Sequence, residues 1–265
     1  MKQQVDERID QYKHEMIEDI KQLVGVPSFT NQTVEVRAAL EMVLEKARNM
    51  GFQTMKTSTD DVGIVEYGTG KEIVGVLVHV DVVGVGDPEK WESDPFQCQE
   101  KDGYLWGRGT IDDKGPVIMG LYALKAMKDL DIVPKKRIWL IVGTAEEQTW
   151  TDMRNFIREF DMPDYGFSPD GDFPIYHIEK GYADVELIFT EPNRNRLIEL
   201  SSGDSTNTIP SKATALLRDQ EPITVNGISV HSSLPWNGDN ALVKLCQRLN
   251  EEETFFFPKF VARFF

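Results

Sequence analysis

Four pairs of acidic or histidine side chains stand near the ends of strand-like runs or glycine turns. They are His79 with Asp81, Asp112 with Asp113, Glu146 with Glu147, and Asp170 with Asp172. Three pairs come directly after apolar, strand-like runs, and the pair at 112–113 lies in the loop GRGTIDDKGP, which leads into a helix. Ligands of an open α/β sheet bind beyond the carboxyl ends of its strands. We therefore expect the four pairs to converge at one rim of a sheet.

Each pair alone has an ordinary interpretation: an incidental His-x-Asp, a solvated Glu-Glu, or two acids that begin a helix. Burying all four pairs together would destabilise the fold, because each buried charge left unpaired costs free energy. A divalent cation would remove that cost. One imidazole with carboxylates suits Zn²⁺, or less selectively Mn²⁺ or Co²⁺, whereas Mg²⁺ and Ca²⁺ prefer oxygen ligands alone. The number of acids predicts two adjacent cations, since one carboxylate can bridge both.

The elements that must position these side chains alternate between strands and helices. The runs IVGVLVHV at 73–80 and RIWLIV at 137–142 have no polar alternation, which is typical of strands buried on both faces of a parallel sheet. Apolar steps of three and four predict one helix over 5–24, a second over 34–50 and a third over 117–130. Further strands are expected at 53–57, 64–67 and 165–168, a hairpin at 97–99 and 104–106, and a helix at 153–160. The fold class is therefore α/β, with a mainly parallel sheet and flanking helices.

The sequence pattern changes after Gly181. We therefore place a domain boundary near residue 182, between domains 1–182 and 183–265. Strands are expected at 183–189, 211–217 and 223–225, and a helix at 240–249. Six of the fourteen phenylalanines fall in the last eleven residues. A free end so rich in aromatic residues would expose an apolar patch unless it packs back on the core. We favour the alternative that the sequence stops before the elements that cover it.

Composition excludes several classes of function. Lys and Arg total 29 and Asp and Glu total 44, which gives a net charge of −15 over 265 residues. A chain this acidic is a poor ligand for nucleic acid or for an anionic membrane. Its two distant cysteines and its charged N-terminal segment fit a protein of the reducing cytoplasm.

Five segments resemble the motifs of a known family. They are GVLVHVDVV, the DPF of WESDPF, YLWGRGTIDDKGP, GTAEEQTW and GFSPDGDFPI. In this order they are similar to the motifs of the co-catalytic di-zinc metallopeptidases, which include acetylornithine deacetylase, succinyl-diaminopimelate desuccinylase, glutamate carboxypeptidase and aminoacylase. DDKGP, the EExxW spacing and SPDxxxPI most resemble the bacterial Xaa-His (β-Ala-Xaa, carnosinase-like) dipeptidases. The resemblance runs from about residue 5 to about residue 245.

The resemblance implies two zinc ions and a role for each site residue. His79 and Asp170 would bind the first zinc, Glu147 the second, and Asp112 would bridge both. Glu146 would be the general base that activates water. Asp81 would hydrogen-bond to its neighbours at the metal site and fix their geometry.

The family also inserts a lid domain, so the resemblance implies an incomplete zinc-exopeptidase-like catalytic domain followed by the start of an α+β lid. ISVHSS at 228–233, followed by Pro235 and the Asn-Ala pair at 240–241, resembles a lid segment of the family. It implies that His231 stabilises the oxyanion and contacts substrate. Asn207, in STNTIP, resembles a lid asparagine that contacts substrate.

One feature of the family is missing. Its second zinc takes a further histidine from the C-terminal part of the catalytic domain, and none of the four histidines here, at positions 14, 79, 177 and 231, matches it. We therefore expect the chain to be a fragment or a degenerate gene product. Three functions stay open: a dipeptidase acting on small dipeptides, an N-acyl amino acid deacylase or desuccinylase with the same metals, and a catalytically dead metal-binding remnant. The sequence leaves the oligomeric state open.

Overall fold

The structure, a computed structural model, describes residues 2–264 except 87, 172–174, 179, 182, 191–195, 204 and 253–254. The chain divides into two compact units, Met1–Ile175 and Tyr176–Phe265. The boundary between these units lies before residue 182, the position that the change in sequence pattern predicts. Within the part of the chain that the structure describes, no helix has the length and apolar character needed to cross a membrane.

The first unit is built on a mixed sheet. Its strands are β1 (Gln53–Lys56), β2 (Gly63–Tyr67), β3 (Ile73–His79), β6 (Arg137–Gly143) and β7 (Tyr165–Phe167). They lie in the order β1-β2-β6-β3-β7, and β3 is parallel to both of its neighbours, β6 and β7. β1 and β2 form an antiparallel edge. The α/β class with a parallel sheet centre is confirmed, and the uninterrupted apolar runs lie in the two strands at that centre.

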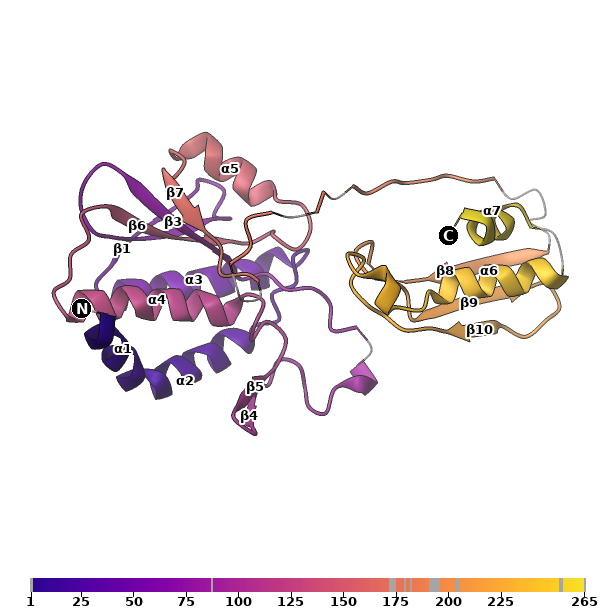
Figure 1. The fold of residues 1–265 in the computed structure, drawn as a ribbon, viewed down its shortest axis with the longest axis horizontal. Coiled ribbons are helices and arrows are strands. Elements are labelled where there is room, and N and C mark those ends of the chain that lie inside the picture. Colours follow the sequence, from indigo (N-terminus) through magenta and orange to yellow (C-terminus); the bar gives the residue numbers. More distant parts are fainter. Residues whose placement is uncertain are drawn as a thin grey trace. The chain divides into compact units, whose positions relative to one another are not determined.

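Helices cover both faces of this sheet (Figure 1). One face carries α3 (Thr33–Asn49) and α4 (Lys114–Asp129), because the apolar side chains that recur every three or four residues along them point into the main core. The other face carries α5 (Thr151–Glu159), whose Phe156 packs edge-on against Trp139 of β6.

The N-terminal segment differs from the single helix expected over 5–24. It forms α1 (Lys2–Gln11) and α2 (Lys13–Val24), which meet at Tyr12. The Tyr12 ring is buried against Tyr122 of α4, and its hydroxyl donates to Asp129. The amphipathic spacing runs through both helices, so it did not reveal that the anchoring of Tyr12 divides them.

In the sequence between β3 and α4, β4 (Gln99–Lys101) and β5 (Tyr104–Trp106) form an antiparallel hairpin. Its first strand begins two residues later than expected. The reason is its turn, in which Asp102 and Gly103 both have positive φ, at 56° and 81°. Such a two-residue turn pairs Lys101 directly with Tyr104 and so sets the register. A short 3-10 helix, Pro88–Lys90, precedes the hairpin.

The second unit is an antiparallel sheet under two helices. β8 (Leu197–Ser202), β9 (Lys212–Leu217) and β10 (Ile223–Asn226) lie in the order β10-β9-β8. α6 (Ala241–Glu252) packs on this sheet, α7 (Phe256–Phe264) packs on α6, and a 3-10 helix spans Pro235–Asn237. Part of the phenylalanine-rich end packs within the unit: Phe255 is buried in its core, and the rings of Phe257 and Phe260 contact Phe189.

The strand expected at 183–189 is wrong. The described residues there form no strand, and the side chains of Val185 and Ile188 are exposed. An extended apolar run becomes a strand only where a neighbouring backbone accepts and donates its hydrogen bonds. Among the described residues of this unit, β8, β9 and β10 pair only with one another, and the run at 183–189 adds to neither outer edge of their sheet. β8, which carries little apolar alternation, was not expected.

Leu121 of α4 offers a test of the main core, since its side chain is fully buried. We expect Leu121→Ala to lower the free energy of unfolding by about 2–5 kcal/mol, through lost burial and the cavity left behind. Met119→Ala on the same helix is the matched control, because its side chain is 60% exposed. Urea unfolding followed by circular dichroism measures both. Equal effects of the two substitutions would contradict this packing.

Candidate metal centre

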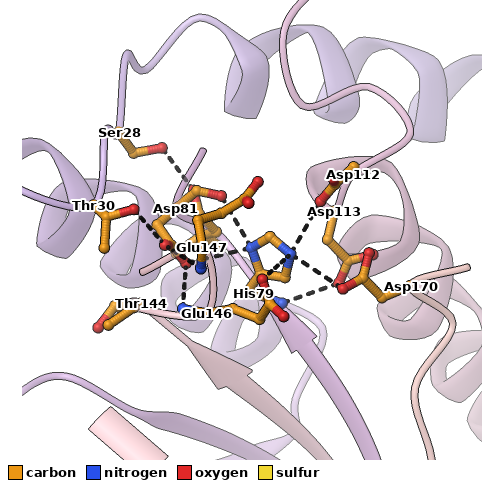
Figure 2. A network of polar contacts seen from close by, with 12 residues as sticks. Ser28, Thr30, His79, Asp81, Asp112, Asp113, Thr144, Glu146, Glu147 and Asp170 are labelled. Atoms are coloured by element: carbon orange, nitrogen blue, oxygen red, sulfur yellow. Dashed lines mark hydrogen bonds and ion pairs between the residues drawn. The ribbon is translucent and has the colours of Figure 1, made fainter. Parts of the chain in front are cut away.

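Three neighbouring strand ends bring most of the predicted site residues together. His79 is the last residue of β3, and its partner in β6 is Gly143. Glu146 and Glu147 follow β6 in the turn before α5. On the other side of β3, β7 ends shortly before Asp170. Since the three strands are parallel neighbours, these side chains meet at one edge of the sheet (Figure 2).

The loop before α4 brings Asp112 to the same edge. The backbone N–H of His79 donates to Asp113 Oδ2 over 3.0 Å, so this buried carboxylate ties the loop to the end of β3. The peptide bond between Asp112 and Asp113 is cis. Asp112 Oδ1 lies 3.1 Å from His79 Nε2. The other acid of the sequence pattern, Asp172, lies outside the described residues.

The His79 ring has one satisfied nitrogen and one that faces carboxylates. The ring is 2% exposed, and its Nδ1 lies 3.0 Å from the carbonyl oxygen of Asp81. A carbonyl oxygen only accepts, so Nδ1 carries a proton and donates it there. Nε2 is buried, and no described neighbour meets the geometry of a hydrogen bond to it. Carboxylate oxygens of Asp112, Asp170 and Glu146 nevertheless lie 3.1, 3.5 and 3.9 Å away.

Two groups of side chains could each hold a metal ion. His79, Glu146 and Asp170 form one, and His79, Asp112 and Glu147 form the other, with ligand atoms within 4.8 Å of one another in each. The structure thus brings together the four residues predicted as ligands. It also brings Glu146, the predicted base, within reach of a ligand position. One nitrogen surrounded by carboxylates is a donor set that fits a divalent transition metal.

The electrostatics of the site explain what a cation would do there. Burial lowers the pKa of His79, but the carboxylates of Asp112, Asp170 and Asp81 outweigh it and hold that pKa far above its usual range. Burial, with the neighbouring acids, raises the pKa of both Glu146 and Glu147 to about 7. A proton on Nε2 therefore occupies the place that a metal ion would take. A cation would offset the mutual repulsion of the acids more fully than that proton does.

Asp81 lies behind His79 as a fully buried carboxylate with several donors. Its two oxygens accept the backbone N–H groups of Glu146 and Glu147, each over 3.2 Å. Thr30 Oγ1 donates to it over 2.7 Å, and His79 Nδ1 lies 3.3 Å away. Burial raises its pKa, but His79, Thr30 and the backbone of Glu147 outweigh this, so the pKa is lowered and Asp81 is held as a carboxylate.

Sequence reasoning missed two residues that shape the site. Asp152 is buried, and its Oδ2 accepts the backbone N–H groups of Thr144 and Ala145 over 2.7 and 3.0 Å, which fixes the start of the glutamate turn. Thr30 comes from the loop after α2. An acid in the first helical turn could have pointed to Asp152, but no local pattern marks Thr30.

His231 and Asn207 belong to the second unit, and the structure brings them close to each other. Ser232 N donates to the carbonyl of Asn207 over 2.7 Å, and His231 pairs with Thr208 as an isolated bridge. His231 Nδ1 lies 2.7 Å from Ser233 Oγ. The structure describes each unit by itself, so their predicted contacts with substrate stay predictions.

Comparison with known proteins identifies the family. The model of peptidase family M20/M25/M40 matches residues 75–255. The chain belongs to this family. The match includes His79 and the acidic residues of both candidate metal groups.

Relatives in Bacillus and Staphylococcus agree with this membership. The protein named "Putative dipeptidase YtjP" of Bacillus subtilis is 34% identical over 91% of this chain and 60% of its own length. A similarly named protein of Staphylococcus haemolyticus, SH1171, is 35% identical over 82% of this chain and 49% of its own length. The chain thus spans three fifths or less of these relatives.

Two solved structures show the same fold. Human carnosine dipeptidase 1 has a TM-score of 0.58 at 23% identity, over 64% of this chain and 41% of that one. Sso-CP2 of Sulfolobus solfataricus, described as an M20 family metallo-carboxypeptidase, has a TM-score of 0.52 at 19% identity, over 60% of this chain and 37% of that one.

Replacement of His79 tests the metal centre. We expect the purified chain to bind Zn²⁺, and His79→Asn to weaken that binding by about a hundredfold or more, since even residues behind the ligands change affinity about 10–100-fold. His14→Asn is the matched control, because His14 is exposed on α2. Competition with a chromophoric chelator, together with metal analysis of the dialysed protein, measures both. Equal zinc affinity in the two variants would overturn the assignment.

Proposed function

We propose that the chain carries the metal-binding catalytic machinery of a dipeptidase. The observation that supports this most strongly is the buried Nε2 of His79, directed at carboxylates on three neighbouring segments in a chain of the M20/M25/M40 family. Two Zn²⁺ ions are the proposed cofactors, with Mn²⁺ or Co²⁺ as substitutes. His79 and Asp170 would hold the first ion and Glu147 the second, with Asp112 shared between them.

Cations bound there would lower the pKa of a water molecule and polarise the carbonyl group of the peptide. The chain itself supplies the proton transfer. Glu146 is proposed as the general base, because its carboxylate lies at the candidate metal groups, 3.9 Å from His79 Nε2. Its carboxylate would take a proton from water and give it to the leaving amine. Asp81 holds the backbone N–H of Glu146 and so limits where that carboxylate can lie.

The proposed substrates are small dipeptides of the β-Ala-Xaa or Xaa-His type. The names of the relatives favour a dipeptide substrate, and the resemblance of the DDKGP and EExxW segments favours this type of dipeptide. His231 is proposed to stabilise the negative charge on the carbonyl oxygen, and Asn207 to contact the substrate. The two cysteines are not bonded to each other, which fits our proposal of a cytoplasmic enzyme.

Glu146 and Glu147 have different proposed roles, so replacing each with glutamine should have different effects on zinc content and turnover. In the full-length enzyme, we expect Glu146→Gln to lower turnover by about 10²–10⁴-fold while zinc content is retained, because a base transfers protons without ligating. Glu147→Gln should lose both zinc and turnover. Glu45→Gln, on the exposed face of α3, is the control for a lost surface charge. If Glu146→Gln lost zinc instead, Glu146 would be the metal ligand and Glu147 the general base.

The choice of substrate distinguishes the dipeptidase from its alternatives. We expect hydrolysis of β-Ala-His or another Xaa-His dipeptide to exceed that of N-acetyl or N-succinyl amino acids, measured by amine release with added Zn²⁺, Mn²⁺ or Co²⁺. The reverse preference would favour a deacylase or desuccinylase. Protein that binds zinc yet hydrolyses neither class would favour the dead remnant.

For the 265-residue chain alone we expect turnover below about one per second, the low end of ordinary enzymes. Asp112 and Glu147 are the side chains proposed for the second cation, fewer than the three protein ligands of an ordinary catalytic zinc site. Faster turnover would mean that a further residue completes that site.

A further inference from the structure

The loop after α2 is tied to the metal-binding edge of the sheet by a set of short hydrogen bonds. Val82 N donates to the carbonyl of Ser28 over 2.9 Å, and the buried Ser28 Oγ donates to the carbonyl of Val80 over 2.6 Å. Phe29 pairs with Val82 as a parallel bridge. These bonds hold residues 28–30 alongside residues 80–82, directly beyond the end of β3.

A second tie reaches the same loop from the opposite side. Lys114, which follows the Asp112–Asp113 pair, is fully buried, and its Nζ donates to the carbonyl of Val26 over 2.6 Å. The loop is thus held between the strand end that carries His79 and the helix start that follows Asp112. A side chain projecting from such a loop has a fixed position relative to both.

Thr30 uses that position to contact Asp81. Its Oγ1 donates to Asp81 Oδ2 over 2.7 Å, shorter than the 3.2 Å bonds that Asp81 accepts from Glu146 N and Glu147 N (Figure 2). A fully buried carboxylate keeps its orientation only while its oxygens have donors. For Asp81, Thr30 supplies one of these donors, a side-chain hydroxyl.

We propose that Thr30 is a positioning residue of the metal centre, which orients Asp81 and, through it, the His79 ring and the glutamate turn. The carboxylate of Asp81 has one side directed at the His79 ring and the other at the backbone of Glu147. Rotation of that carboxylate would move donors on both sides at once. The proposal concerns metal affinity and extends the proposed function, on which its consequence for catalysis rests.

The test replaces only the hydroxyl of Thr30. We expect Thr30→Val, which keeps the shape of the side chain, to weaken Zn²⁺ affinity about 10-fold or more, within the 10–100-fold range for residues behind metal ligands. Thr30→Ser, which keeps the hydroxyl, should bind within about threefold of the parent chain. Chelator competition on the purified chain with Zn²⁺ alone gives the affinities, and circular dichroism of the metal-free proteins shows whether each variant is folded.

Thr57→Val is the matched control. Thr57 is buried and, like Thr30, donates to an aspartate: its Oγ1 lies 2.6 Å from Asp61 Oδ1, in a turn before β2 that contains no candidate ligand. We expect its zinc affinity to equal that of the parent chain. An equal loss in Thr57→Val would mean that loosening of the fold, rather than Thr30, weakens the site, and would overturn the proposal.

A double-mutant cycle shows whether Thr30 acts through Asp81. In the Asp81→Asn background, Thr30→Val should change zinc affinity less than about twofold, because the carboxylate that it orients is gone. The same tenfold loss in both backgrounds would overturn the proposal, as would parent-like affinity in Thr30→Val. Zinc binding with intact Thr30 dependence, together with hydrolysis of N-acyl amino acids and not of dipeptides, would overturn the proposed function alone. A parent chain that binds no zinc would overturn both.

Discussion

The burial of one imidazole among carboxylates is the constraint on which the first unit depends. His79 ends β3, and its Nε2 has acidic neighbours contributed by the segment after β7, by the turn after β6 and by the loop before α4. Like charges held this close repel one another, so the surrounding structure must keep them from moving apart. Hydrogen bonds from uncharged donors hold several of these acids in place: backbone N–H groups donate to Asp81, Asp113 and Asp152. The turn before α5 and the loop after α2 both contribute donors to these buried acids.

Much of this arrangement could be predicted from the sequence, because its causes are local. Uninterrupted apolar runs mark β3 and β6 as interior strands, and parallel neighbours end at the same edge. Acids placed directly after such runs then have to meet. This reasoning finds His79, Glu146 and Glu147 without any knowledge of the loops between them. The resemblance to a peptidase family adds their proposed roles, which neither spacing nor charge supplies.

The parts that could not be predicted depend on contacts between residues far apart in the sequence. Thr30 meets Asp81 across 51 positions, and nothing near Thr30 marks it as part of a metal centre. The division between α1 and α2 depends on Tyr12 reaching α4, while the apolar spacing continues through it. The run at 183–189 has the composition of a strand, but its described residues pair with none of β8, β9 and β10. In each case a local preference was overridden by which partners were available.

The division of the chain into two units separates two kinds of chemistry. Every described side chain of the candidate metal groups lies in the first unit. The residues proposed to contact substrate, His231 and Asn207, lie in the second unit, where hydrogen bonds fix them relative to each other. The proposed substrate contacts of His231 and Asn207 would affect turnover, whereas the candidate ligands of the first unit would affect zinc affinity. For this reason a substitution that changes zinc affinity reports on the buried charges around His79, and one that changes turnover at constant zinc content reports on proton transfer or on the second unit.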